Sequence, residues 1–311
     1  MSESKPLDNA LLQKHDVRPY GSDYTIYDII GDFLTEGPSE KPFYIIDLAE
    51  VVSAFQKWTS LLPNVKPYYA VKCNPNPVLI ETLAFLGAAF DCASETEIRS
   101  VIDITNNPGN IVYANPCKMC SQIRFARSVD VDLMTFDCRE ELYKIKLYHP
   151  YAKLILRIAV DDSASVCKFN KKFGCKLSQV EDVLKVAKML ELDVCGFSFH
   201  AGSGCMDPTK FYEAIGDCRK ACDIAKRNDI SISLIDVGGG FSASDIKVKF
   251  EDIATNINKA MDDFFGEDLE SGKIKFMAEP GRFFAERSHT LVLNVIGKRN
   301  VGIKVDLCRG K

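Results

Sequence analysis

Short β-branched and aromatic runs alternate with helical patterns along most of this chain, and this alternation limits its fold more than any other feature. The runs are PYYAVK (67–72), AAFDCA (88–93), NIVYAN (110–115), DLMTFD (132–137), LILRIA (154–159), VCGFSFH (194–200), ISLIDVGGG (232–240) and KFMAEP (275–280). Amphipathic segments such as SQVEDVLKVAKMLEL lie between them, with apolar residues at helical spacing. Continuous apolar strands joined by helices predict a parallel sheet buried on both faces, and eight such strands predict a closed (β/α)8 barrel, the TIM barrel.

Polar residues mark the ends of these runs, where a barrel of this kind gathers its chemistry. In chain order the ends carry Lys72, Asp91, Asn115, Asp137, Arg157, His200, Gly238 to Gly240, and Glu279. Strands end in polar residues in any fold, and this plain interpretation suits Asn115 and Asp137. It suits less well a lysine, a histidine and a glutamate that share one barrel mouth with a triple glycine.

The triple glycine in LIDVGGGF follows the seventh run and indicates a phosphate site. Glycines let backbone amides approach an anion closely, and phosphate sites after the seventh and eighth strands are frequent in such barrels. A tight turn is the alternative, but we favour phosphate. Arg282 in AEPGRF and Ser203 in HAGSG are further candidates to bind the same anion.

Lys72 ends an apolar run beside this phosphate site, which suggests a Schiff base with pyridoxal 5'-phosphate. We expect burial to lower the pKa of its amine, which would favour attack on a carbonyl. Glu279 is the candidate partner of the pyridine nitrogen, since a close carboxylate favours the protonated ring by on the order of 1–3 pKa units. His200 could cover one face of the ring, although a single histidine is more often a satisfied core residue.

Composition excludes several other classes of protein. The net charge of -4 and the lack of a basic block argue against a nucleic-acid surface. No apolar run is long enough to span a membrane, and the polar N-terminus does not resemble a signal peptide. The 12 cysteines are scattered, so we expect reduced thiols in a cytoplasmic protein. Cys117 and Cys120 have CxxC spacing, but there is no second pair to complete a zinc site, and no metal is expected.

Seven segments together carry a family resemblance: PYYAVKCN, FDCASETEI, YANPCK, LRIAVDDS, FHAGSGC, DVGGGF and AEPGRF. They resemble the eukaryotic ornithine decarboxylases, which belong to the barrel group of pyridoxal-phosphate decarboxylases together with relatives of alanine racemase. The resemblance extends from about Phe43 to the end of the chain. HAGSGC and KCN resemble the ornithine branch rather than the diaminopimelate or arginine branches. The resemblance implies a lyase of polyamine biosynthesis that converts L-ornithine to putrescine.

The resemblance also implies a role for each matching residue. Lys72 would bind the cofactor covalently, His200 would stack on its ring, and Glu279 would hold the pyridinium. The remaining cofactor-binding residues would be Asp91, Arg157, Ser203, Gly238, Gly239, Gly240, Gly281 and Arg282. Lys172 in KKFG matches a lysine that pairs with the other subunit of a homodimer with shared active sites. Antizyme is a further partner implied by the family, on a surface after NPCK.

The resemblance divides the chain into three parts and predicts an incomplete site. Residues 1–42 would belong to a β-sheet domain, residues 43–284 would form the cofactor-binding barrel, and residues 285–311 would begin the C-terminal β-domain. In the family that domain supplies a Cys-Asp pair, acids that contact the substrate's δ-amine, and a tyrosine on the phosphate. Arg309 follows Cys308, so the Cys-Asp pair is not matched. We therefore expect the chain to have little activity on ornithine, the strand TLVLNVIG (290–297) to have few partners, and YTIYDII (24–30) to have little to pack against.

Three interpretations stay open. The first is an ornithine decarboxylase truncated at its C-terminus. The second is a non-catalytic protein of the antizyme-inhibitor kind, which would have no need of Lys72, His200 and Glu279 together. The third is a bare-barrel or racemase-like protein, which the two-domain pattern of the family disfavours. The sequence does not decide between ornithine and lysine as substrate.

Overall fold

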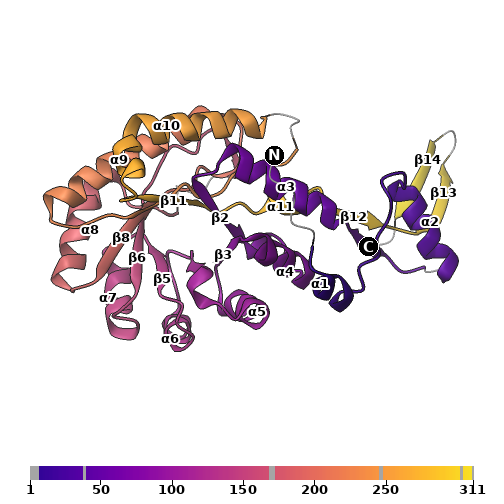
Figure 1. The fold of residues 1–311 in the computed structure, drawn as a ribbon, viewed down its shortest axis with the longest axis horizontal. Coiled ribbons are helices and arrows are strands. Elements are labelled where there is room, and N and C mark those ends of the chain that lie inside the picture. The colour runs from indigo at the N-terminus through magenta and orange to yellow at the C-terminus, as the bar shows by residue number, and fades with distance from the viewer. Residues whose placement is uncertain (1–6, 38–39, 168–171, 245–247, 302–303, 310–311) are drawn as a thin grey trace.

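Eight parallel strands close into a barrel in the computed structural model, which describes residues 7–37, 40–167, 172–244, 248–301 and 304–309 (Figure 1). Their order around the barrel is β10-β11-β2-β3-β4-β5-β6-β8. The strands are β2 Val65–Ala70, β3 Ala89–Cys92, β4 Ile111–Tyr113, β5 Leu133–Phe136, β6 Lys153–Arg157, β8 Asp193–Ser198, β10 Leu234–Asp236 and β11 Lys275–Ala278. Each strand overlaps one of the eight predicted runs, so the predicted (β/α)8 barrel is confirmed.

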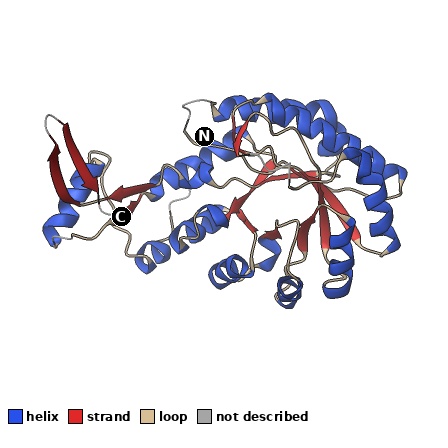
Figure 2. Ribbon diagram, turned by 180° about the vertical axis from the view of Figure 1, so that it is seen from behind, coloured by secondary structure: helices blue, strands red, loops and turns tan. Residues whose placement is uncertain are grey.

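Helices surround the strands (Figure 2). They are α3 Leu48–Leu61, α4 Pro77–Leu86, α5 Glu95–Thr105, α6 Cys120–Ser128, α7 Arg139–Tyr148, α8 Leu177–Met189, α9 Thr209–Arg227, α10 Phe250–Glu270 and the short α11 Arg282–Ala285. The sequence explains the bounds of α4: the side chain of Asn76 accepts a hydrogen bond from the Val78 amide, Pro77 begins the helix, and Gly87 ends it with a left-handed φ of 104°. No helix of the described residues is long and apolar enough to cross a membrane.

An aromatic cluster anchors the loops at the mouth of the barrel. Trp58 in α3 contacts the rings of Phe241, Phe250 and Phe283, and its indole N–H donates to the Val65 carbonyl oxygen at 2.9 Å. Fully burying a side chain such as Phe contributes about 1.5–3 kcal/mol relative to leaving it exposed. Phe241 follows the triple glycine and Phe283 follows Arg282, so the same cluster fixes both loops.

The N-terminal segment packs partly on the barrel. In α1, Asn9–Lys14, the buried side chain of Leu11 contacts Leu48 and Val78 from α3 and α4. Next to this contact, Glu81 of α4 pairs with Lys14 at 2.8 Å and with His15 at 2.7 Å. The next helix, α2 Ile26–Glu36, has no buried residue, as expected for a segment with little to pack against.

Among the described residues three small antiparallel sheets accompany the barrel, and two of them are formed by the segments that flank it. β1 Phe43–Ile46 pairs with β12 His289–Val292, and β13 Val295–Val301 pairs with β14 Lys304–Arg309. The predicted single strand 290–297 is therefore wrong, because the segment divides between β12 and β13 and each part has a partner. Its apolar side chains are nonetheless exposed, including Leu291 at 44%, Val295 at 54% and Ile296 at 73%.

Candidate active site

Lys72 lies at the mouth of the barrel, in a 3-10 turn of Val71–Cys73 that follows β2. Its Nζ forms an ion pair with Oδ2 of Asp91 in β3; the Lys72 side chain is 47% exposed, whereas the Asp91 side chain is fully buried. The two meet because β2 and β3 are neighbours and Ala70 lies opposite Asp91. β2 ends at Ala70, so Lys72 follows the strand rather than ending it.

The charges around Lys72 decide its protonation. Burial alone would lower the pKa of Lys72, but the negative charges of Asp91 and Glu279 outweigh it and raise the pKa above its ordinary value. The expectation of a lowered amine pKa is therefore wrong. Burial acts as predicted, but the sequence does not show which acids lie across the neighbouring strands.

Glu279 follows β11 and lies beside a second acid, Asp236 of β10. The backbone N–H of Glu279 donates to the Gly238 carbonyl oxygen at 2.7 Å, which joins the ends of the two strands. Burial, followed by the charges of Asp236 and Asp91, raises the pKa of Glu279 well above its usual range. Burial also raises the pKa of Asp236 to about 7. Asp236 was not among the predicted site residues. The signal for it in the sequence is an aspartate inside an apolar strand of a buried parallel sheet, where charged residues are rare.

Arg157, the last residue of β6, supplies a second positive charge. Its Nε and Nη2 atoms are buried and have no hydrogen-bond partner among the described residues. Burial lowers the pKa of Arg157, while Glu279, Asp137 and Asp236 act in the opposite direction. The guanidinium carbon lies 5.4 Å from the centre of the Phe173 ring. Buried hydrogen-bond donors without partners cost free energy, so a polar ligand that accepts from this guanidinium would stabilise the site.

His200 lies just after β8 and is neutral. Its Nδ1 accepts a hydrogen bond from the Gly202 N–H at 2.9 Å, which leaves the ring proton on Nε2. Burial and the positive charges of Arg157 and Lys72 lower the pKa of His200 to about 3. The site therefore presents an uncharged flat ring next to Lys72 and the acids.

The loop Gly238–Gly240 accepts only glycine. A Cβ atom would lie 2.1 Å from the Phe199 carbonyl oxygen at Gly238, 2.9 Å from the Glu279 carbonyl oxygen at Gly239, and 2.6 Å from the Gly202 carbonyl oxygen at Gly240. Gly238 and Gly240 also have left-handed φ values of 65° and 114°. Backbone thus packs against backbone on this side of the mouth.

Ser203 and Arg282 meet on the same side of the mouth. Ser203 begins β9 Ser203–Cys205, which pairs with β7 Ser165–Cys167, and its Oγ accepts a hydrogen bond from Nη2 of Arg282 at 2.7 Å. A Cβ atom on the neighbouring Gly281 would lie 3.0 Å from the Cβ of Cys73, beside Lys72. The predicted phosphate ligands are therefore brought together from three separate loops.

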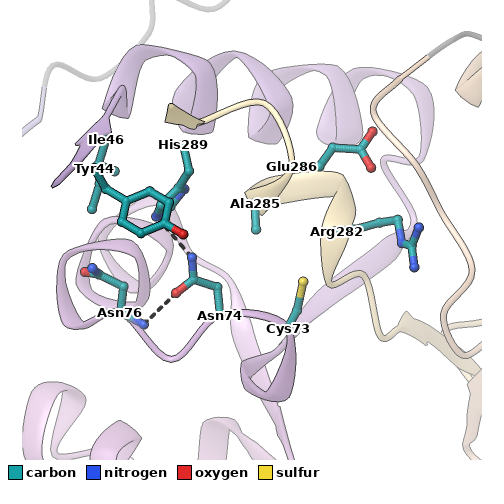
Figure 3. Close-up of a pocket in the computed structure, with 9 residues that line it drawn as sticks. All are labelled: Tyr44, Ile46, Cys73, Asn74, Asn76, Arg282, Ala285, Glu286 and His289. Atoms are coloured by element: carbon teal, nitrogen blue, oxygen red, sulfur yellow. Dashed lines mark hydrogen bonds between the residues drawn. The ribbon is translucent and has the colours of Figure 1, made fainter. Parts of the chain in front are cut away.

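A cavity of about 460 Å³ lies beside this cluster (Figure 3). Cys73 and Arg282 lie on one side of it and Tyr44 and His289 on the other, and the side-chain amide nitrogen of Asn74 is 3.0 Å from Nε2 of His289. Lys72 does not line this cavity, but Arg282 connects it to Ser203. The cavity is thus an extension of the site toward the β1–β12 sheet.

The other predicted positions have structural roles or lie outside the cluster. Asn115 approaches the Ala93 carbonyl oxygen at 3.5 Å, and Asp137 accepts the Gly174 N–H at 2.9 Å. Both contacts agree with the plain interpretation of these strand ends. Lys172 is exposed on the loop before α8.

The residues at the mouth fit pyridoxal phosphate. Buried polar atoms without partners among the described residues gather here: Asp91 Oδ1, Asp236 Oδ2, Arg157 Nε and Arg157 Nη2. The glycine loop with Ser203 and Arg282 is suited to a phosphate group, which binds close to backbone amides and to arginine. The lysine, the acids and the neutral histidine are suited to an aldehyde, a pyridine nitrogen and a flat ring, respectively.

Comparison with known proteins agrees with this fit. Residues 48–286 match the family model described as "Pyridoxal-dependent decarboxylase, pyridoxal binding domain". Ornithine decarboxylase from Rattus norvegicus is 45% identical over 282 residues, which are 89% of this chain and 60% of that protein. Antizyme inhibitor 2 from Xenopus laevis is also 45% identical, over 83% of this chain and 56% of that protein. The chain thus spans about 60% of the length of the rat relative.

A solved structure shares the fold over most of the chain. It is the arginine decarboxylase of Paramecium bursaria Chlorella virus bound to agmatine, with a TM-score of 0.86, 37% identity, and coverage of 91% of this chain and 75% of that one. The family match covers the barrel and every residue of the charged cluster. The chain therefore belongs to the pyridoxal-dependent decarboxylases, and its cofactor is pyridoxal phosphate.

Proposed function

We propose that this chain carries the cofactor-binding part of an ornithine decarboxylase, which releases carbon dioxide from L-ornithine and yields putrescine. The observation that carries the proposal is the Lys72–Asp91 pair beside Glu279, His200 and the glycine loop, in a chain 45% identical to a named ornithine decarboxylase. In this proposal residues 43–284 are the cofactor-binding barrel, and residues 1–42 and 285–311 belong to a β-sheet domain. A cytoplasmic homodimer, in which Lys172 pairs with the partner subunit, follows from the same family relationship.

The residues of this chain divide the work of the proposed reaction. Ser203, Arg282 and the amides of the glycine loop would bind the cofactor phosphate. Lys72 Nζ would hold the cofactor through its aldehyde, and Asp91 holds the proton on that nitrogen in the free chain. The bound cofactor takes up the electron pair left behind when the carboxyl group departs.

Two further groups control the cofactor ring. Glu279 would hold the pyridine nitrogen and favour its protonated form. Neutral His200 would cover one face of the ring and add no positive charge there, because its pKa is lowered to about 3. Arg157 lies beside the acids and partly balances their negative charge.

Release of carbon dioxide from carboxyl-labelled ornithine tests the activity. The assay compares this chain, the same chain joined to the C-terminal segment of the rat relative, and the Lys72→Ala variant of each. We expect turnover in the joined protein, little in the chain alone, and none with Lys72→Ala. Lysine and arginine assayed in parallel determine the preferred substrate. Turnover that survives Lys72→Ala would exclude the proposed role of this residue.

A second candidate is a non-catalytic protein of the antizyme-inhibitor kind, favoured by the match to antizyme inhibitor 2. The intact cluster of Lys72, His200 and Glu279 speaks against it, because a protein that only binds another protein has no use for a lysine held beside buried acids. The absorbance spectrum of the chain with pyridoxal phosphate distinguishes the two. A protein of this kind stays colourless, whereas the proposed enzyme gains the band of the bound cofactor.

A further inference from the structure

Asp236 is a buried acid that the proposed reaction does not use. It is the last residue of β10, and its side chain is fully buried at 0% exposure. Its Oδ1 accepts a hydrogen bond from the Gly238 N–H at 2.8 Å. Its Oδ2 is also buried and has no hydrogen-bond partner among the described residues. The carboxyl group of Glu279 lies close enough to interact with that of Asp236. An acid of this kind needs an explanation, because an unpaired buried oxygen costs free energy.

The carboxyl groups of Asp236 and Glu279 can form a hydrogen bond with each other only if they share a proton. Two carboxylates in contact repel, so one of them stays protonated at neutral pH, as in other buried carboxyl pairs. The Gly238 N–H donates to Asp236 and stabilises its charged form, but this N–H does not donate to the carboxyl group of Glu279. The shared proton therefore belongs on Glu279, whose carboxyl group can then donate to that of Asp236.

We propose that Asp236 is a positioning residue that orients the carboxyl group of Glu279 by this shared proton and places a second negative charge behind it. The inference rests on the proposed role of Glu279 toward the pyridine nitrogen. When Glu279 gives its proton to that nitrogen, the O–H bond breaks, an N–H bond forms, and Glu279 becomes a carboxylate. The pyridinium would then lie in the field of two carboxylates, Glu279 and behind it Asp236, and would hold its proton more tightly than with one carboxylate alone.

Other charges reach this pair from the neighbouring elements. Asp91 of β3 adds negative charge to both acids, whereas Lys72 after β2 acts on Glu279 and Arg157 of β6 acts on Asp236 in the opposite direction. Two neutral groups also lie within reach of the charge of Asp236: Tyr68 of β2 and Cys218 of α9. The test therefore compares variants in which only Asp236 or Glu279 changes.

The first experiment measures the protonation of the cofactor ring directly. The wild-type chain and Asp236→Asn are loaded with pyridoxal phosphate labelled with ¹⁵N in the ring, and the nitrogen chemical shift is followed against pH. We expect Asp236→Asn to lower the pKa of the ring nitrogen by about 1–3 units, as for loss of a close charge. Asp137→Asn is the matched control, since Asp137 also follows a barrel strand and accepts a backbone N–H. A pKa unchanged by Asp236→Asn, or lowered equally by the control, overturns the proposal.

A double-mutant cycle then tests whether Asp236 acts through Glu279. The dissociation constant of pyridoxal phosphate is measured for wild type, Asp236→Asn, Glu279→Gln and the double variant. We expect Asp236→Asn to weaken binding about tenfold, the equivalent of one pKa unit, and to have no further effect in the Glu279→Gln background. Equal losses in both backgrounds would show that Asp236 acts independently and overturn the proposal.

A third measurement needs neither cofactor nor a folded Asp236 variant. Infrared spectra of the cofactor-free chain at neutral pH report the C=O stretch of a protonated carboxyl group. We expect this band in wild type and its loss in Glu279→Gln. The proposal fails if wild type lacks the band or if the band survives in Glu279→Gln. None of the three readouts depends on decarboxylation, so failure of the proposed activity would leave this inference separately testable.

Discussion

Replacing Asp91 by asparagine should make Lys72 react with the cofactor at lower pH. Asp91 is fully buried and pairs with Lys72 Nζ, so its charge holds the proton on that nitrogen. Only the unprotonated amine attacks an aldehyde. Asparagine keeps the size of the side chain and removes the charge, which isolates the electrostatic contribution of Asp91.

The expected shift follows from the geometry of the pair. Two unit charges 4 Å apart interact by about 4 kcal/mol at an effective dielectric constant of 20, and one pKa unit corresponds to about 1.36 kcal/mol. This energy corresponds to about three pKa units. Because the Lys72 side chain is 47% exposed, solvent screening reduces the interaction. We expect the pKa of Lys72 to fall by about one to two units, which increases the unprotonated fraction at neutral pH about 10- to 100-fold.

The assay follows covalent attachment of pyridoxal phosphate to the cofactor-free chain as a function of pH, at saturating cofactor, with borohydride trapping at each time point. Wild type, Asp91→Asn and the control Asp137→Asn are compared by the pH midpoint of the attachment rate. We expect the midpoint to move to lower pH in Asp91→Asn alone. A midpoint that stays in place, moves upward, or moves equally in the control would refute the electrostatic role of Asp91.

Three further outcomes are expected. Borohydride reduction with pyridoxal phosphate should label Lys72, and peptide mapping that finds the label spread over surface lysines would contradict this assignment. Gly238→Ala should lower the free energy of unfolding by at least about 1–2 kcal/mol, because φ is 65° at this position and the new Cβ would clash with the Phe199 carbonyl. The control Gly266→Ala in α10 has free space around its new Cβ and should raise the free energy of unfolding. Urea unfolding measures both changes. His200 has a folded pKa of about 3, below its unfolded value, so it contributes stability that is complete above the unfolded pKa and is lost as pH falls toward 3. His200→Asn should remove a slope of at most about 1.4 kcal/mol per pH unit between pH 3 and 6.5, and an unchanged slope would show that His200 is not neutral in the fold.

The barrel and much of the site could be predicted because both depend on local patterns. A strand buried on both faces is a continuous apolar run, and a parallel barrel brings the ends of all such runs to one mouth. Lys72, His200 and Glu279 therefore share a site as soon as the eight runs are placed in order. The glycine loop could also be predicted from a local pattern, because three successive glycines after a strand indicate a loop whose backbone approaches other groups closely.

What the sequence did not show depends on which side chains face each other across strands. The pKa of Lys72 is raised because Asp91 and Glu279 outweigh burial, and that balance needs distances between neighbouring strands. The contact of Asp236 with Glu279 likewise depends on β10 and β11 being neighbours. The pairing of β1 with β12 joins segments from opposite ends of the chain, which no local pattern specifies.

One strand and the loop after it carry both the buried acid and the glycines of the candidate site. Asp236 ends β10 and contacts Glu279, whereas Gly240 of the loop that follows packs against Gly202, next to the Ser203 that accepts a hydrogen bond from Arg282. The acids would repel a phosphate group, so the two sites must be kept apart, and the hydrogen bond from the Gly238 N–H to Asp236 fixes the point at which the chain turns from one to the other. This arrangement would explain why an aspartate and three glycines occur together in LIDVGGG: in the proposed site the aspartate would act on the ring nitrogen through Glu279, and the glycines would bind the phosphate.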